Sequence, residues 1–104
     1  MAGDVNTFTA TGTIVTQPTL VNIKNNKQLL VFRIRCTEEF LRPNGDPASH
    51  ENFFTIEVLG KNAYKYADTL KKGSRYAFYG YLRSDEIDGL ERTRARCYQI
   101  LEHR

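Results

Sequence analysis

Alternation of apolar and polar side chains is the strongest constraint that this sequence places on its fold. Residues 5–15, VNTFTATGTIV, place Phe8, Ala10, Gly12 and Ile14 on one face and a row of threonines on the other. Successive side chains of a β-strand point to opposite faces, so this period of two predicts a half-buried strand. A glycine in the middle of such a strand is typical of a bulge or a sharp bend.

The same alternation predicts a hairpin over residues 19–37. Its turn is Asn25-Asn26, because asparagine tolerates the positive φ that a two-residue hairpin turn requires. The second arm has an inner face of Leu30, Phe32, Ile34 and Cys36 and an outer face of Val31, Arg33, Arg35 and Thr37. Residues 41–51, LRPNGDPASHE, contain two prolines and a glycine and predict a polar loop.

Two adjacent phenylalanines, Phe53 and Phe54, open the next predicted strand, residues 53–59. Alternation with Ile56 and Val58 assigns Phe54 to the core and leaves Phe53 on the surface. The outward face of this strand is then Phe53, Thr55, Glu57 and Leu59.

One helix and two further strands follow. Residues 61–72, KNAYKYADTLKK, carry apolar residues at helical spacing. The two final lysines suit the negative end of the helix dipole, and Gly73 is typical of the position just after a helix. Residues 75–83 form a strand with Tyr76, Phe78 and Leu82 inward, SDEIDGLE forms an acidic turn at its Asp-Gly pair, and RTRARCYQIL forms the last strand.

The order strand, hairpin, strand, helix, strand, strand predicts an all-β fold with one short helix. A meander of this kind is typical of a five-stranded oligonucleotide-binding (OB) barrel. With 104 residues and no repeat or linker, the chain is expected to be one domain, residues 1–104, with a core from about residue 5 to residue 101.

Basic and aromatic side chains are interleaved on the predicted outer surface. The net charge is +3, which suits a polyanionic partner without requiring one. Single-stranded nucleic acid needs cations for its phosphates and flat rings for its unpaired bases. The alternative is that the rings pack across strands or form an oligomer interface. The candidate binding residues are Arg33, Arg35, Phe40, Phe53, Tyr79, Tyr81, Arg83, Arg92, Arg94 and Arg96.

No catalytic or metal-binding pattern accompanies these residues. The sequence contains no Ser-His-Asp set, phosphate-binding loop or paired metal ligands, so we expect no enzyme activity, no metal site and no cofactor. Cys36 and Cys97 form no CxxC pair and have no histidine nearby, which favours structural thiols in a reducing compartment over zinc ligands. A disulfide between them is the alternative.

The start of the chain, MAGDVNTFTATG, has neither a basic leader nor an apolar run. No segment approaches the roughly 20 apolar residues of a membrane span. We therefore expect a protein that is not secreted and has no membrane partner, located in the cytoplasm with the nucleoid or in an organelle matrix.

The sequence resembles the single-stranded-DNA-binding proteins of bacteria and mitochondria from Val5 to about Ile100. The motifs that carry the resemblance are Val5-Asn6, Gly12 and Pro18 near the start, and then Leu59-Gly60-Lys61, Ala67, Leu70, Lys72-Gly73-Ser74, Gly80 and Leu82-Arg83. The resemblance implies an OB barrel that assembles through its first strand, as a tetramer or a dimer. It also implies base stacking on Phe40 and Phe53, and a binding surface on or near Arg33, Arg35, Lys61 and Arg83.

Three features depart from the family pattern. Leu59 and Ile87 stand where the family often has aromatic residues, which implies weaker or differently routed binding. The chain stops at LEHR, whereas the family continues into a Gly- and Pro-rich tail with an acidic tip. We therefore expect either a truncated chain or a tail-less branch, such as primosomal replication proteins or the OB-fold subunits of mitochondrial RNA-editing complexes.

The function expected from these features is sequence-tolerant binding of single-stranded nucleic acid. DNA is the expected ligand and RNA the alternative, because both present phosphates and ring faces. The expected role lies in DNA replication, recombination or repair. The alternative function is that of an interaction subunit of a primosome or an RNA-processing complex, which binds other OB folds or single-stranded RNA.

Overall fold

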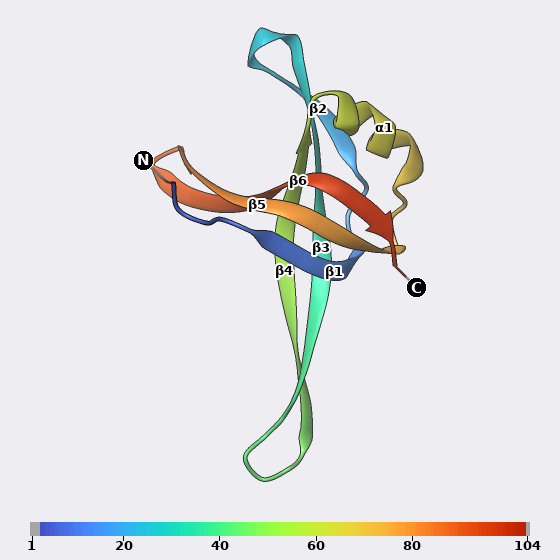
Figure 1. Cartoon of the computed structure of the whole chain (residues 1–104), viewed down its shortest axis with the longest axis vertical. Coiled ribbons are helices and arrows are strands. Elements are labelled where there is room, and N and C mark those ends of the chain that lie inside the picture. Colours follow the sequence, from blue (N-terminus) through green and yellow to red (C-terminus); the bar gives the residue numbers. More distant parts are fainter. Residues whose placement is uncertain (1–2, 104) are drawn as a thin grey trace.

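The computed structural model describes residues 3–103, which contain six strands, one α-helix and a short 3₁₀ turn (Figure 1). The elements are β1 (Phe8–Ile14), β2 (Thr19–Ile23), η1 (Lys24–Asn26), β3 (Lys27–Leu41), β4 (Pro47–Leu59), α1 (Lys61–Thr69), β5 (Arg75–Ile87) and β6 (Leu90–Glu102). Within this part of the chain, no helix is long and apolar enough to cross a membrane.

Five of the strands close into a barrel. The sheet order is β1-β5-β6-β4-β3-β2, and β1 also pairs with β3 through Thr13↔Arg35 and Ile14↔Ile34. That extra pairing joins the two ends of the set β1, β5, β6, β4 and β3, and leaves β2 paired to β3 outside the ring. All pairings are antiparallel except β4 with β6, which is parallel. The prediction of a five-stranded OB barrel is confirmed.

The inner faces predicted from alternation fill the barrel. Phe32, Ile34, Ile56, Val58 and Phe78 are at most 2% exposed. Helix α1 packs beside β2, β3 and β4, and its buried residues include Ala63 and Tyr66, as helical spacing predicted. The Tyr66 hydroxyl accepts a hydrogen bond from the backbone N–H of Ile100 at 3.1 Å, which ties α1 to the last strand.

Gly12 permits the closure of the barrel and does not form a bulge. The β1–β5 ladder runs through Gly12 without a change of register. A Cβ atom at this position would lie 2.7 Å from the carbonyl oxygen of Arg35 on β3. Glycine is needed here because the backbones of β1 and β3 approach too closely for a side chain.

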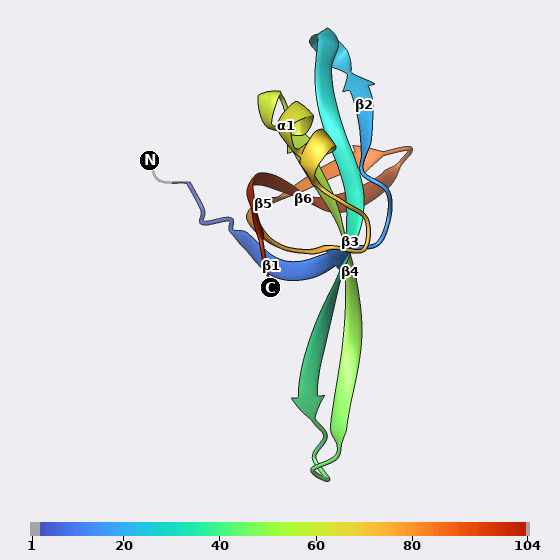
Figure 2. The same ribbon diagram turned by 90° about the vertical axis from the view of Figure 1, so that its right-hand side faces the viewer.

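The β3–β4 hairpin is longer than the sequence indicated. Residues 41–51 were expected to form a loop, but the ladder continues from Leu29↔Leu59 to Leu41↔Pro47, and only residues 42–46 connect the strands. Proline is tolerated as the first residue of a strand, so Pro47 does not end the pairing. Residues 36–52 therefore form a two-stranded arm that projects from the barrel (Figure 2).

The β2–β3 turn agrees with the prediction in its backbone and differs in its length. Asn25 and Asn26 have φ values of 68° and 57°, the left-handed conformation expected for asparagine in a hairpin turn. Because Ile23 pairs with Lys27, the turn contains three residues, not two.

Three further expectations need correction. The α-helix ends at Thr69, so Lys71 and Lys72 lie beyond it, and Gly73 has φ of 90° in the turn toward β5. The expected acidic turn is short, because β5 extends to Ile87 and β6 begins at Leu90, with positive φ at Asp88 and Gly89. Leu82 was expected to be buried but is 43% exposed, because β1 pairs with β5 only as far as Gly80.

Candidate nucleic-acid interface

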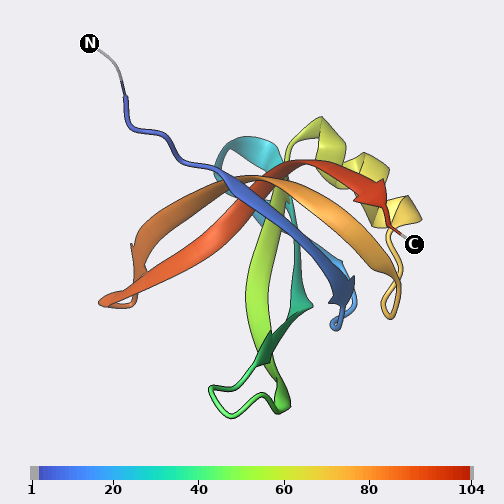
Figure 3. The same ribbon diagram turned by 60° about the horizontal axis from the view of Figure 1, so that its bottom comes forward.

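A groove of about 580 Å³ lies between the β3–β4 strands and the β5–β6 hairpin. Figure 3 shows these two ribbons leaving the barrel in different directions. Side chains from β3 and β4 form one wall and side chains from β5 and β6 the other. The first wall includes Arg33, Phe53 and Thr55, and the second includes Leu82, Ile87, Glu91, Arg92 and Arg94.

The adjacent rings of Phe53 and Phe54 separate as alternation predicted. Phe54 packs against the core, with its ring centroid 5.6 Å from that of Phe8 in an edge-to-face arrangement. Phe53 is 46% exposed, and the guanidinium carbon of Arg33 lies 5.8 Å from its ring centroid. A flat ring with a cation beside it is the arrangement that a stacked base with a neighbouring phosphate requires.

Phe40 lies on the other face of the β3–β4 ribbon. The register is constant along the ladder, with Arg35 opposite Phe53 and Phe40 opposite Ala48. Phe40 therefore has the same parity along β3 as the inward Ile34, and the grouping of Phe40 with the outward residues Arg33 and Arg35 was wrong. Phe40 is nevertheless 45% exposed, because the arm at this point has left the barrel. Its role in stacking stays a prediction.

Most of the predicted basic residues are engaged by carboxylates. Arg83 Nε lies 3.1 Å from Asp85, Asp85 also contacts Arg94, and Glu57 contacts both Arg94 and Arg96. The hydrogen bond from Arg83 is the main reason that the pKa of Asp85 lies below its usual value. Arg35 is at the limit of an ion pair with Glu51, at 4.0 Å. Among residues 3–103, Arg33, Arg92 and Lys61 make no ion pair.

Glu57 is a buried carboxylate whose burial alternation does not predict. It was assigned to the outward face of β4, which is correct, but it is only 5% exposed. The reason is that β6 lies beside β4, with Glu57 paired to Arg96 and Ile56 paired to Ala95. The sequence contained one signal of this pairing, a lone carboxylate on the strand of Glu57 and arginines two residues apart on the last strand. Only the strand order, which places β6 beside β4, brings these side chains together.

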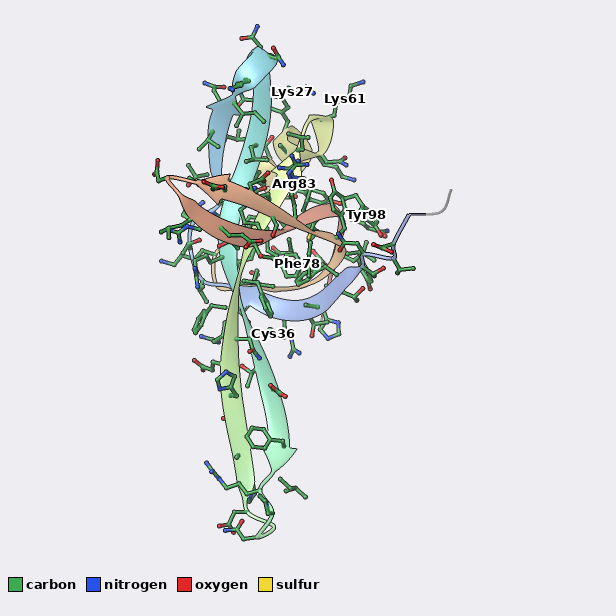
Figure 4. The ribbon with its side chains drawn as sticks, turned by 90° about the vertical axis from the view of Figure 1, so that its left-hand side faces the viewer. Lys27, Cys36, Lys61, Phe78, Arg83 and Tyr98 are labelled. Atoms are coloured by element: carbon green, nitrogen blue, oxygen red, sulfur yellow. The ribbon has the colours of Figure 1, made fainter. Side chains whose placement is uncertain are left out.

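The remaining candidates are spread around the molecule. Tyr79 is half-buried opposite Thr9 of β1, and Tyr81 is 37% exposed opposite Arg96. Lys61 begins α1, near the same end of the molecule as Lys27, whereas Arg83 lies on β5 (Figure 4). The structure thus brings Arg33, Phe53, Arg92 and Arg94 into one groove. Phe40, Lys61, Tyr79 and Tyr81 do not line this groove.

Comparison with known proteins decides the family. Residues 5–103 match the model of the Single-strand binding protein family. The chain belongs to this family. No curated protein matches the chain in sequence. Family membership confirms the predicted function, binding of single-stranded DNA, and members of this family are binding proteins, not enzymes.

Solved structures share the fold of this single-strand binding protein. The small single-stranded DNA-binding protein from Streptomyces coelicolor is 24% identical with a TM-score of 0.68, and the match covers 93% of each chain. A Plasmodium falciparum SSB in complex with ssDNA is 18% identical with a TM-score of 0.81, over 92% of this chain and 89% of that one. A deletion mutant of the single-stranded DNA binding protein from Thermus aquaticus is 22% identical with a TM-score of 0.82, but the 92% of this chain that matches covers only 49% of it.

Proposed function

We propose that this chain binds single-stranded DNA in the groove between the β3–β4 strands and the β5–β6 hairpin. The observation that carries this proposal is the exposed ring of Phe53 with Arg33 beside it, in a groove that Arg92 also lines. Among residues 3–103, Arg92 has no ion-pair partner. A base stacks on Phe53, and the phosphates on either side of that base contact the two arginines. Stacking and phosphate contacts read no base edges, so binding is sequence-tolerant.

The proposed role is protection of exposed single strands during DNA replication, recombination or repair. Binding needs no cofactor, because charge and stacking supply the affinity. We propose that the protein acts in the cytoplasm with the nucleoid or in an organelle matrix.

Salt dependence of binding tests the proposed role of the basic residues. If phosphate contacts supply much of the affinity, log affinity falls linearly with log salt, with a slope of about −0.7 per phosphate on a single strand. Replacement of Arg33 and Arg35 with alanine should make the slope shallower. The measurement is a titration of labelled oligothymidylate at several salt concentrations. An unchanged slope would show that these two residues do not contact phosphate.

The same titration with oligouridylate distinguishes DNA from RNA. We expect tighter binding of the DNA strand. Equal or tighter binding of the RNA strand would favour the alternative function in RNA processing.

A homo-oligomer, tetramer or dimer, is proposed to form through β1. One edge of this strand pairs with β5 from Phe8 to Thr13. The other edge pairs with β3 only at Thr13 and Ile14, so from Phe8 to Gly12 it has no partner strand within residues 3–103. An open edge of this kind invites a strand from another copy.

The alternative function, an interaction subunit, is favoured by one observation. Arg83, Arg94 and Arg96 are occupied by acidic partners within the chain, so they are less available to phosphate. Weak binding of both DNA and RNA, together with a stable oligomer, would support this alternative.

A further inference from the structure

Five charged side chains of alternating sign cross three neighbouring strands. Asp85 lies between Arg83 and Arg94, and Glu57 lies between Arg94 and Arg96. We call this set the charge ladder; its members are Arg83 and Asp85 on β5, Arg94 and Arg96 on β6, and Glu57 on β4. Each carboxylate therefore has an arginine on both sides.

The side chains of the charge ladder become less exposed from β5 through β6 to β4. The side chains of Arg83 and Asp85 are 48% and 38% exposed, those of Arg94 and Arg96 are each 14% exposed, and that of Glu57 is 7% exposed. The two oxygens of Glu57 are divided between the arginines. Nε of Arg94 lies 3.0 Å from Oε2, and Nη2 of Arg96 donates a hydrogen bond of 3.0 Å to Oε1. If either arginine moved to a phosphate, the negative charge of the buried Glu57 would lose one of its two ion-pair partners. Leaving a buried charge without its partner is strongly unfavourable.

The charge ladder crosses the contact between β4 and β6, which is the one parallel pairing among residues 3–103. Strands β4 and β6 pair only at Ile56↔Ala95 and Glu57↔Arg96. The β5–β6 hairpin, which carries Ile87 and Arg92 on one wall of the groove, is joined to β4 across this seam. The ion pairs of the charge ladder also join β4 to β6, so they fix one wall of the groove relative to the other.

We infer that Glu57 is a positioning residue for DNA binding. It withdraws Arg94 and Arg96 from phosphate contact and holds the β5–β6 hairpin so that Arg92 lines the same groove as Arg33 and Phe53. The inference rests on the proposed function for the identity of the groove. It assigns the phosphate contacts to Arg33 and Arg92, and a structural role to two of the arginines that the sequence offered as phosphate ligands.

Chemical modification of the wild-type protein tests whether Arg94 and Arg96 are withdrawn from phosphate contact. Hydroxyphenylglyoxal is applied with and without oligothymidylate, and the modified arginines are identified by mass spectrometry. We expect Arg33 and Arg92 to react in the free protein and to be protected by the oligonucleotide, and Arg94 and Arg96 to be unreactive in both states. Ready modification of Arg96 in the free protein, followed by protection by DNA, would overturn the inference.

A matched pair of variants tests whether the ion pairs of Glu57 position the β5–β6 hairpin for DNA binding. Arg92→Gln and Arg96→Gln remove the same charge from two sites on β6 that lie on either side of Arg94. We expect Arg92→Gln to reduce the magnitude of the salt slope by about 0.7. We expect Arg96→Gln to leave the slope unchanged while weakening binding about tenfold through loss of alignment at Phe53. A reduced slope for Arg96→Gln would place this arginine on a phosphate, and unchanged affinity would remove the positioning role; either result refutes the inference.

Glu57→Gln distinguishes failure of the inference from failure of the proposed function. In this variant Arg94 and Arg96 should become reactive toward hydroxyphenylglyoxal in the absence of any DNA. If they stay unreactive, Glu57 does not hold them and the inference fails. If they react but neither Arg33 nor Arg92 of the wild type is protected by DNA, the groove is not the binding site and both the proposed function and the positioning role fail. If Arg96→Gln does not fold, the wild-type modification pattern still decides the assignment of the phosphate contacts.

Discussion

Two neighbouring rings in the middle of β4 have opposite environments, and their substitution should have opposite effects. Phe54→Ala removes a ring that packs on Phe8 and should cost about 3 kcal/mol of stability. Phe53→Ala removes a ring that is 46% exposed and should change stability by no more than about 0.5 kcal/mol. It should instead weaken single-strand binding by ~1–3 kcal/mol, the contribution of one stacked base.

Each of these variants requires one melting curve and one titration. The two act as controls for each other, because they remove the same ring from adjacent positions. A destabilised Phe53→Ala beside a normally stable Phe54→Ala would show that the strand register is shifted by one residue.

The two cysteines should differ in reactivity. Burial raises the pKa of the Cys97 thiol to about 12, so almost no thiolate forms at pH 8–9, and the side chain is only 3% exposed. Cys36 is half-buried at the base of the arm. We expect iodoacetamide at pH 8.5 to modify the folded protein once, at Cys36, and denatured protein twice. Rapid modification of Cys97 in the folded protein would contradict this expectation.

The raised pKa also makes stability depend on pH. The unfolded thiol ionises near its ordinary value of about 9, whereas the folded thiol keeps its proton up to about pH 12. The folded state therefore binds the proton more tightly, so the contribution of Cys97 to stability is complete below pH 9 and is lost as pH rises from 9 to 12. Cys97→Ser should make the alkaline decline shallower in denaturant unfolding curves measured over this range.

At the level of strands and helices, alternation was a reliable guide only where the barrel covers one face. It correctly separated Phe54 from Phe53 and placed Phe32 and Ile34 in the core. It failed at Leu82, which has the inward parity of β5 but lies beyond Gly80, the last residue of β5 that pairs with β1. It also does not predict the exposure of Phe40, which has the inward parity of β3 but lies in the arm that projects from the barrel. It also missed the burial of Glu57, since the strand that covers it comes nearly forty residues later in the chain.

Backbone crowding at Gly80 provides a prediction about the β5–β6 hairpin. The ladder changes register between Tyr79 and Gly80, and a Cβ atom at Gly80 would lie 2.1 Å from the carbonyl oxygen of Arg96. Gly80→Ala should therefore push the strands apart and cost about 2 kcal/mol or more in thermal or denaturant unfolding. Gly3→Ala is the control, because no atom lies within 4 Å of a Cβ atom at that position. Equal stability of the two variants would show that the hairpin adapts to the added methyl group.

For the whole molecule, the strand order brings binding residues together that the sequence presents separately. Arg33, Phe53 and Arg92 come from β3, β4 and β6, and they line one groove because β4 lies between β3 and β6 in the sheet. Residue types alone suggested ten binding positions, and the sequence could not show which of the arginines already had acidic partners. Ion pairing depends on the three-dimensional arrangement, so the division of the arginines into free and occupied groups required the structure.

The open edge of β1 provides the prediction at the scale of the assembly. A second copy that adds its own β1 antiparallel to this edge would place equivalent residues of the two copies close together across a two-fold axis. Thr9 is exposed in the part of β1 that has no second partner, so Thr9→Glu should place like charges near each other and weaken the pairing. Thr69→Glu, at the exposed end of α1, adds the same charge away from this edge and serves as the control. Light scattering at micromolar concentration should give a multiple of the 12.0 kDa chain mass for the wild type and for Thr69→Glu, and a lower mass for Thr9→Glu. A wild-type mass of 12.0 kDa would refute assembly through β1, and an unchanged oligomer in Thr9→Glu would place the interface on another surface.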